Sequence, residues 1–166
     1  MSAGQKKLLS EMPGSKNRLV VRSAEAADAK PISELVAQLG YPANSEEIPP
    51  RLTAIAEFQD ALALVAVDGG VVVGFISGQM IPMIHQSDPF AMLTALVTAE
   101  THRGSGIGSL LVSHVERWAV DKGAVRLSLT SGIHRKEAHA FYERRAYART
   151  GFRFMKKLDP DLTAEG

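Results

Sequence analysis

The sequence predicts a single α/β domain built on a mixed β-sheet with helices on its faces. Short apolar runs, typical of strands, alternate along the chain with segments whose apolar residues recur every three or four positions. The early strands are joined by a tight Asp-Gly turn, which favours antiparallel pairing. Helices separate the later strands, where parallel pairing is natural. The predicted element order is β α α β β β α β α β β.

Length and composition limit the classes of protein to consider. The chain has 166 residues and a formal net charge of +1, so charge gives no case for nucleic acid or a membrane surface as partner. It has no cysteine, which excludes disulfides, thiolate metal sites and a cysteine nucleophile. No apolar run approaches a bilayer span, and the N-terminus lacks a signal-peptide core. We therefore expect a cytoplasmic protein with a flexible tail at 1–17, a domain at 18–158 and a polar tail at 159–166.

The first half of the chain reads as a strand, two helices and a hairpin. A strand at 18–22 is followed by a turn in which Ser23 or Asp28 could cap a helix that ends at Gly40. A second short helix is entered near 45–50 and runs through 52–58. The period then changes to that of strands at 61–67 and 71–80, joined by Asp68-Gly69-Gly70. Gly74 and Gly78 weaken the second of these strands unless something approaches closely or the strand bends there.

The rest of the chain is organised around a glycine-rich loop between a strand and a helix. The strand covers 91–98, and the loop reads Arg103-Gly104-Ser105-Gly106-Ile107-Gly108. The helix then places its apolar residues on one face, namely Ile107, Leu110, Leu111, Val115 and Trp118. Glycines leave backbone amides uncovered, and a helix begins with unpaired amides and the positive end of its dipole. Together these features predict a cradle for a pyrophosphate.

The spacing of the loop distinguishes between phosphate ligands. No Gly-Lys-Ser/Thr triplet ends it, so it is not a Walker loop, and Ser109 stands where the dinucleotide fingerprint needs its third glycine. The loop resembles the acyl-CoA signature Arg/Gln-x-x-Gly-x-Gly/Ala of the GNAT superfamily of N-acyltransferases, through Arg103, Gly106 and Gly108.

The second half of the chain extends this resemblance. After a strand at 125–130, a helix at 134–145 carries Ala138 and Tyr142, as the family pattern Ala-x-x-x-Tyr requires, and a final pair of short strands is expected at 147–156. Two residues depart from the pattern. Arg135 stands where many members have Asn, and Ala146 replaces the glycine of a terminal Gly-Phe, so we expect no glycine-only backbone angle there.

The resemblance implies a GNAT-like fold and an acetyl-CoA-dependent N-acetyltransferase that transfers the acetyl group directly in a ternary complex. It implies that the pantetheine arm pairs with Leu96, Val97 and Thr98, with an oxyanion donor among the amides near Val97. Tyr142 is either the general acid that protonates the leaving thiolate or a packing residue. The remaining residues expected to bind the cofactor are Arg103, Gly104, Ser105, Gly106, Ile107, Gly108, Ser109, Arg135 and Ala138.

The acceptor side is less specified. Glu100, His85, Asp88 and Glu47 are candidates for the general base, and Glu47, His85 and Asp88 for acceptor contacts; His139 is expected to pack or hydrogen-bond. The histidines lack metal-like spacing, so we expect no metal. A loose similarity to aminoglycoside N-acetyltransferases favours a primary amine of a small molecule. A protein N-terminus or lysine as acceptor, and a non-catalytic CoA-binding module, are the alternatives, and a homodimer is a further expectation.

Overall fold

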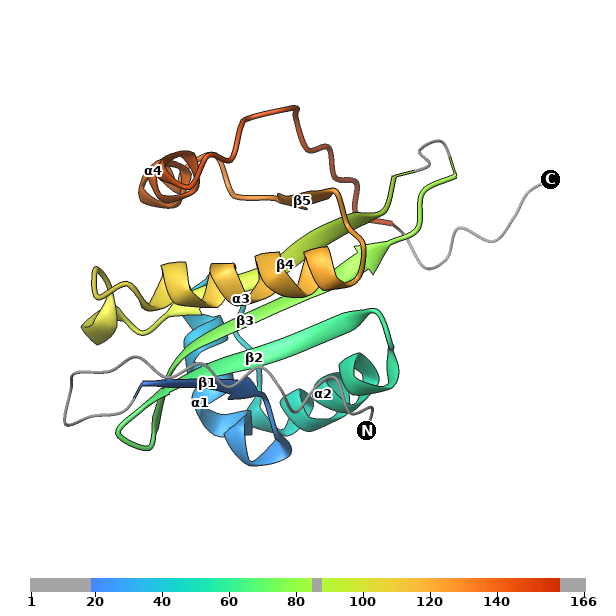
Figure 1. Ribbon diagram of the computed structural model, residues 1–166. Helices are drawn as coiled ribbons and strands as arrows, with labels where there is room; N and C mark the ends of the chain where they lie inside the picture. The colour runs from blue at the N-terminus through green and yellow to red at the C-terminus, as the bar shows by residue number, and fades with distance from the viewer. Residues whose placement is uncertain (1–18, 85–87, 159–166) are drawn as a thin grey trace. The chain divides into compact units, whose positions relative to one another are not determined.

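A five-stranded mixed sheet forms the first part of the protein. The computed structural model describes residues 19–84 and 88–158, which fall into two compact units divided after Leu129. The sheet of the first unit has the order β1-β2-β3-β4-β5, antiparallel except for the parallel β4–β5 pair (Figure 1). Its strands are β1 (Val20–Ser23), β2 (Ala61–Asp68), β3 (Val71–Ile81), β4 (Phe90–Thr98) and β5 (Arg126–Leu129). The predicted mixed sheet is confirmed.

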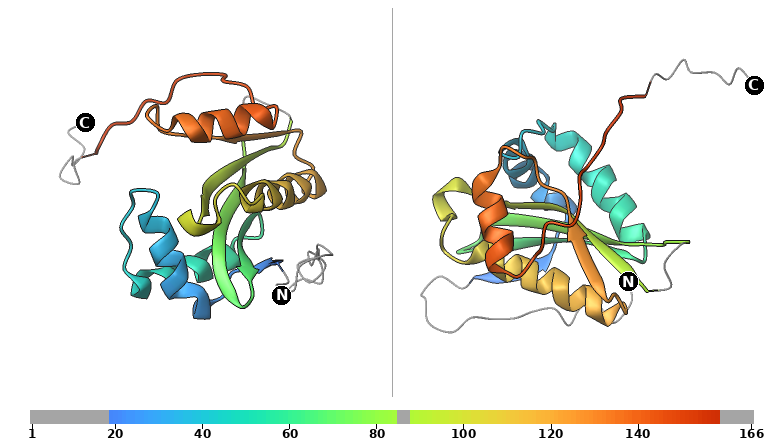
Figure 2. Two further views of the ribbon diagram at one scale, coloured as in Figure 1. Left: turned by 90° about the vertical axis from the view of Figure 1, so that its left-hand side faces the viewer. Right: turned by 90° about the horizontal axis from the view of Figure 1, so that it is seen from above.

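Three α-helices of the first unit cover the two faces of this sheet. They are α1 (Ala29–Ala37), α2 (Ile48–Glu57) and α3 (Ile107–Asp121), with short 3-10 helices at Ala26–Asp28, Ser45–Glu47 and Glu100–His102. Figure 2 shows α1 and α2 on one side of the sheet and α3 on the other. The second unit contains α4 (Lys136–Arg144).

Strand alternation explains which helices pack on which face. Val65, Phe75 and Val97 stand opposite one another on β2, β3 and β4, and they form one core cluster with α1 and α2. Because neighbouring residues of a strand point to opposite faces, Gly74 faces the other side, where it contacts α3. The two cores of the unit therefore share the same central strands.

The glycines of β3 make room for α3. A Cβ atom built on Gly74 would lie 2.9 Å from Leu111 Cδ1 and 3.1 Å from Ile107 Cγ2, and one on Gly78 would lie 3.3 Å from Val115 Cγ1. Close approach, one of the two reasons expected for glycine here, is confirmed. The helix backbone comes nearer to β3 than it could over side chains.

The final strands predicted for Tyr147–Lys156 are not formed, which corrects the sequence interpretation. After α4 the described residues of the second unit contain neither helix nor strand. Phe152 and Phe154, whose alternation predicted a strand, are exposed. A strand exists only where a neighbouring strand accepts its backbone hydrogen bonds, and none of the described strands pairs with this segment.

Ala146 corrects a second expectation. Its φ is +65°, in the left-handed region that favours glycine, and it is the only non-glycine residue with positive φ in the described part of the chain. Its N–H donates to Glu143 O, and the N–H of Tyr147 donates to Tyr142 O, both at 3.0 Å. These two bonds form a Schellman motif, which holds the backbone angle without glycine.

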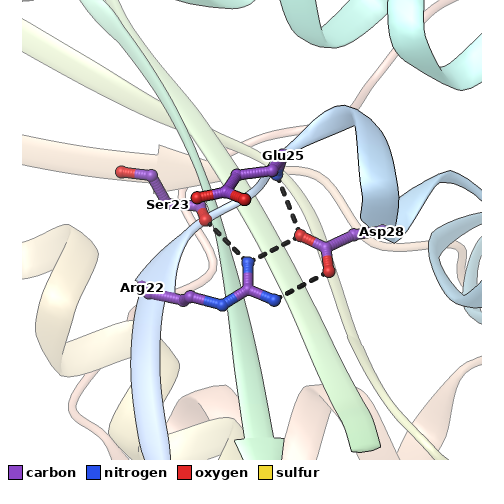
Figure 3. A network of polar contacts seen from close by, with 4 residues as sticks. All are labelled: Arg22, Ser23, Glu25 and Asp28. Atoms are coloured by element: carbon purple, nitrogen blue, oxygen red, sulfur yellow. Dashed lines mark hydrogen bonds and ion pairs between the residues drawn. The ribbon is translucent and has the colours of Figure 1, made fainter.

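An ion pair between buried Asp28 and half-buried Arg22 connects β1 to the start of α1 (Figure 3). The Arg22 guanidinium donates to both carboxylate oxygens of Asp28, at 2.7 and 2.8 Å, and the Glu25 N–H donates to Asp28 Oδ2 at 2.9 Å. Burial opposes the charge of Asp28, but the bonds from Arg22 and Glu25 outweigh it, and the pKa of Asp28 is lowered. Asp28 therefore acts through a capping box with Glu25 and makes no side-chain cap on α1.

We expect Asp28→Asn to lower the free energy of unfolding by about 3 kcal/mol, because it leaves a partly buried guanidinium without its carboxylate. The measurement is urea unfolding at pH 7. Glu47→Gln is the matched control, since Glu47 and its partner Arg51 are both exposed and such pairs contribute little. An equal loss in the two variants would contradict this role of the buried pair.

His114 is fully buried on α3, where its spacing from Ile107, Leu111 and Trp118 places it on the apolar face of the helix. Burial lowers the pKa of His114 below the usual histidine value of about 6.5, and the charge of Arg117 lowers it further. The unfolded chain therefore takes up a proton at a higher pH than the folded protein does. Stability from this group is complete above pH 6.5 and decreases as the pH falls below that value.

We expect the free energy of unfolding to decrease below pH 6.5 by at most about 1.4 kcal/mol per pH unit, and His114→Gln to flatten this dependence. The measurement is urea unfolding between pH 5 and 7.5. Exposed His134→Gln serves as the control and should keep the wild-type slope. A slope unchanged by His114→Gln would show that another group titrates.

Candidate functional site

Strand β4 has a free edge over its second half. It pairs with β5 only from Phe90 to Leu93, while its pairing with β3 continues to Thr98. At the point of divergence Thr94 is an extra residue, a β-bulge, because Ser77 pairs with Ala95 and Gly78 pairs with Leu93. Ser77 Oγ and Thr94 Oγ1 lie 2.7 Å apart and hold the bulge to β3. Sequence reasoning missed this bulge, for which the sequence offers no signal.

The direction of the backbone amides shows which groups this free edge presents. The N–H of Ala99 donates to Val73 O at 2.8 Å and therefore points toward β3. Successive N–H groups of a strand alternate in direction, so the Val97 N–H also points toward β3. The N–H groups of Leu96 and Thr98 point to the opposite side, where no described strand pairs with them. An extended ligand can add to this edge as a further strand.

The glycine loop continues from the end of β4. Gly104 and Gly106 have φ values of +77° and +88°, and a Cβ atom on either would meet nothing within 4 Å. Glycine is needed here for the backbone angle and not for packing space. Gly106 is the N-cap of α3, and it provides no side-chain cap.

The first turn of α3 therefore presents unpaired amides. The first helical bond runs from the Leu110 N–H to Gly106 O at 2.9 Å. The amides of Ile107, Gly108 and Ser109 precede it and have no acceptor within the helix. They lie at the positive end of a 15-residue helix. The arrangement fits an anion such as a diphosphate.

Polar side chains surround this loop. Arg103 is half-exposed and lies 3.5 Å from Glu100, its ion-pair partner. Ser105 donates to His102 O at 2.5 Å. An open hollow of about 260 Å³ lies beside the loop, lined by Leu19, Ser105, Gly106, Ser109, Leu110 and Ser113. Of the apolar residues expected on one face of α3, Ile107, Leu111, Val115 and Trp118 are buried, and Leu110 is half-buried and lines this hollow.

The second unit holds the other predicted residues on and beside α4. Arg135 is the N-cap residue, and Ala138 and Tyr142 lie one turn apart. The Tyr142 ring makes edge contacts with Phe141 and Tyr147, with ring centres 5.1 and 5.6 Å apart. Burial raises the pKa of Tyr142, and the charge of Arg135 partly offsets this rise. The phenol is therefore protonated at neutral pH.

His139 also belongs to the second unit. Its Nε2 lies 2.9 Å from Gly132 O, which confirms the expectation that this histidine makes a hydrogen bond.

The acceptor candidates within the described residues are exposed. Glu47 is exposed and paired with Arg51, and Asp88 is exposed. His85 lies outside the described residues. Among residues 19–84 and 88–158, no three His, Cys, Asp or Glu side chains are grouped as metal ligands. No helix in this part of the chain has the length and apolar character needed to cross a membrane.

A comparison with protein families matches residues 31–147 to the acetyltransferase (GNAT) family. The chain belongs to this family. The match includes β4, the glycine loop, α3 and Tyr142. Of the described helices and strands it leaves out β1, the 3-10 helix at Ala26–Asp28 and the first two residues of α1.

Individual relatives agree with this assignment. The chain is 38% identical over 93 residues to the aminoalkylphosphonate N-acetyltransferase of Salmonella typhimurium, covering 56% of this chain and 60% of that protein. It is 43% identical over 47 residues to an uncharacterized N-acetyltransferase of Bacillus subtilis, covering 28% of this chain and 33% of that protein. The matches thus span less than two thirds of either relative.

Solved structures show the same fold. The aminoglycoside N-acetyltransferase AAC(6')-Iy, solved in complex with CoA, has a TM-score of 0.76 at 15% identity, covering 89% of this chain and 98% of that one. Glucosamine-6-phosphate N-acetyltransferase from Arabidopsis thaliana has a TM-score of 0.75 at 19% identity, covering 85% and 99%.

We expect Gly106→Ala to lower the free energy of unfolding by about 1 kcal/mol, because a side chain is strained at this left-handed angle. The measurement is urea unfolding. Gly108→Ala is the control, because Gly108 lies inside α3, where alanine is favoured over glycine, and its stability should stay equal or rise. Equal losses in both variants would contradict a conformational role for Gly106.

Proposed function

We propose that the protein is an acetyl-CoA-dependent N-acetyltransferase that acts on a primary amine of a small molecule in a ternary complex. The observation that carries the proposal is the continuity of two features in the first unit. The free edge of β4 ends at Thr98, and the unpaired amides of the α3 N-terminus begin at Ile107. An extended arm that ends in a diphosphate fits this order of backbone groups. Membership of the acetyltransferase family also supports the proposal.

The residues for the donor follow from this arrangement. The amides of the loop and of the first turn of α3, from Arg103 to Ser109, bind the diphosphate, and Leu96 and Thr98 pair with the pantetheine arm. The oxyanion donor is the N–H of Leu96 or Thr98, because the Val97 N–H points toward β3. Arg135 and Ala138 contact the cofactor from α4. Acetyl-CoA supplies the acetyl group as a thioester.

Tyr142 provides the proton for the departing thiolate. In the reaction the amine nitrogen forms a bond to the acetyl carbon, the carbon–sulfur bond breaks, and the thiolate takes the phenolic proton. The raised pKa keeps this proton on Tyr142 before the reaction, and Arg135 favours the phenolate that forms. The amine first loses a proton to a base drawn from Glu100, His85, Asp88 and Glu47, or through water.

The acceptor class rests on the relatives. The names of an aminoalkylphosphonate and an aminoglycoside acetyltransferase both describe small primary amines as substrates of those proteins. Small amines are thus the first acceptors to test, with aminoalkylphosphonates and aminoglycosides at the head of the panel. Glu47, His85 and Asp88 are the proposed acceptor contacts. The exposed apolar side chains of Phe152 and Phe154 support a homodimer as a further part of the proposal.

Release of free thiol from acetyl-CoA across this amine panel tests the function. We expect one class of small amines to give turnover, and Tyr142→Phe to lower kcat by about 100-fold with little change in KM for acetyl-CoA, because only proton donation is lost. Tyr147→Phe is the matched control, since it keeps the aromatic contact with Tyr142.

Other results of this assay lead to different functions. Turnover with peptides but not with small amines would assign a protein acceptor. CoA binding without turnover on any amine, together with no effect of Tyr142→Phe, would leave a CoA-binding module and overturn the enzyme. If Gly106→Glu, which places a carboxylate in the cradle, left CoA affinity unchanged, the cradle itself would be wrongly assigned.

A further inference from the structure

Two glycines of β3 pack against α3 at different points along the helix. Gly74 and Gly78 are four residues apart and face the same side of the sheet. The residues of α3 above Gly74 are Ile107 and Leu111, in its first two turns, and the residue above Gly78 is Val115, in its third turn. The two contacts have the same chemistry and differ in their distance from the N-terminus of the helix.

The contact at Gly74 is the tighter one. The distances from an added Cβ atom would be 2.9 Å to Leu111 Cδ1 and 3.1 Å to Ile107 Cγ2, against 3.3 Å for Val115 Cγ1 at Gly78. Ile107 Cγ2 can move away only by rotation about χ1, and a buried isoleucine in a helix is held to one χ1 rotamer. Leu111 is fully buried, so its side chain has no free space to enter. A methyl group at position 74 therefore displaces the first turns of α3.

Gly74 also lies beneath both ends of the candidate site. Its partner on β4 is Thr98, the last residue of the free edge. Its contact on α3 is the side chain of Ile107. Ile107 is the first residue of the helix, and its N–H is one of the unpaired amides. Because Gly74 has no side chain, the start of α3 lies close to the end of β4. These two segments would bind opposite parts of one ligand.

We infer that Gly74 is a positioning residue for CoA. It holds the first turn of α3, with its diphosphate-binding amides, at the correct distance from the end of β4. This inference rests on the proposed function, because the ligand is the one proposed there. Gly78, which supports the third turn, stabilises the fold without affecting CoA.

Titration calorimetry with CoA tests this inference, at a temperature where every variant is folded. We expect Gly74→Ala to weaken CoA binding by about tenfold, because a displacement of the amides by a fraction of an ångström removes their alignment with the diphosphate. Gly78→Ala is the matched control. It adds the same methyl group against the same helix, and its Kd for CoA should stay within about twofold of the wild type.

A compensating substitution separates position from stability. Leu111→Val removes the Cδ1 atom nearest to Gly74, so the double variant Gly74→Ala/Leu111→Val should regain most of the CoA affinity. If Gly74→Ala does not fold, Ile107→Leu replaces it, because leucine lacks the Cγ2 methyl and loosens the same contact from the helix side. Val115→Leu is then the control at Gly78.

The outcomes distinguish this inference from the proposed function. Wild-type protein that fails to bind CoA overturns the proposed function, and the inference with it. Wild-type protein that binds CoA, with equal affinities in Gly74→Ala and Gly78→Ala, overturns the inference alone. If Ile107→Leu and Val115→Leu are used instead, equal CoA affinities in these two variants likewise overturn the inference alone.

Discussion

The structure of the first unit depends on the way β4 is paired. Over Phe90–Leu93 the strand has neighbours on both edges, and beyond Leu93 it has a neighbour on one edge only. The bulge at Thr94 marks the change, and the loop and α3 follow directly after the free part of the strand. Backbone groups that a sheet would normally use are therefore presented beside the unpaired amides of a helix. Unsatisfied main-chain groups in two neighbouring elements define the candidate site more strongly than any side chain does.

The two faces of the sheet have different packing. The face toward α1 and α2 is built from large side chains such as Phe75 and Val97, and the face toward α3 has glycine at two positions of β3. The second brings helix atoms close to strand backbone and leaves little freedom of position. A ligand that contacts both β4 and α3 needs this second kind of packing.

Much of this architecture could be predicted from the sequence. The hairpin at Asp68-Gly69-Gly70, the extent of α3 and the glycine loop follow from local patterns, since turn chemistry and helical periodicity are properties of short segments. Gly74 and Gly78 indicated either a close approach or a bend of the strand, and the sequence did not show which element approaches. Of the acceptor candidates, Glu47 is exposed and paired with Arg51, and His85 lies outside the described residues.

The remaining features depend on contacts that no short segment encodes. The alternation of Phe152 and Phe154 predicts a strand, but pairing requires a partner strand. Ala146 adopts a glycine-like angle because the two bonds of the Schellman motif hold it. The bulge at Thr94 likewise results from tertiary packing.

The parallel pairing of β5 has a consequence for how the first unit assembles. β2 and β3 are joined by two glycines, whereas the chain between β4 and β5 runs from 99 to 125 and includes the whole of α3. Closing the longer connection costs more chain entropy, and the β4–β5 pairing that offsets this cost has only four residue pairs. The antiparallel strands have the more local route to their contacts. The pairing of β5 with β4 is therefore the part of the sheet whose formation depends most on α3 already being packed against the sheet.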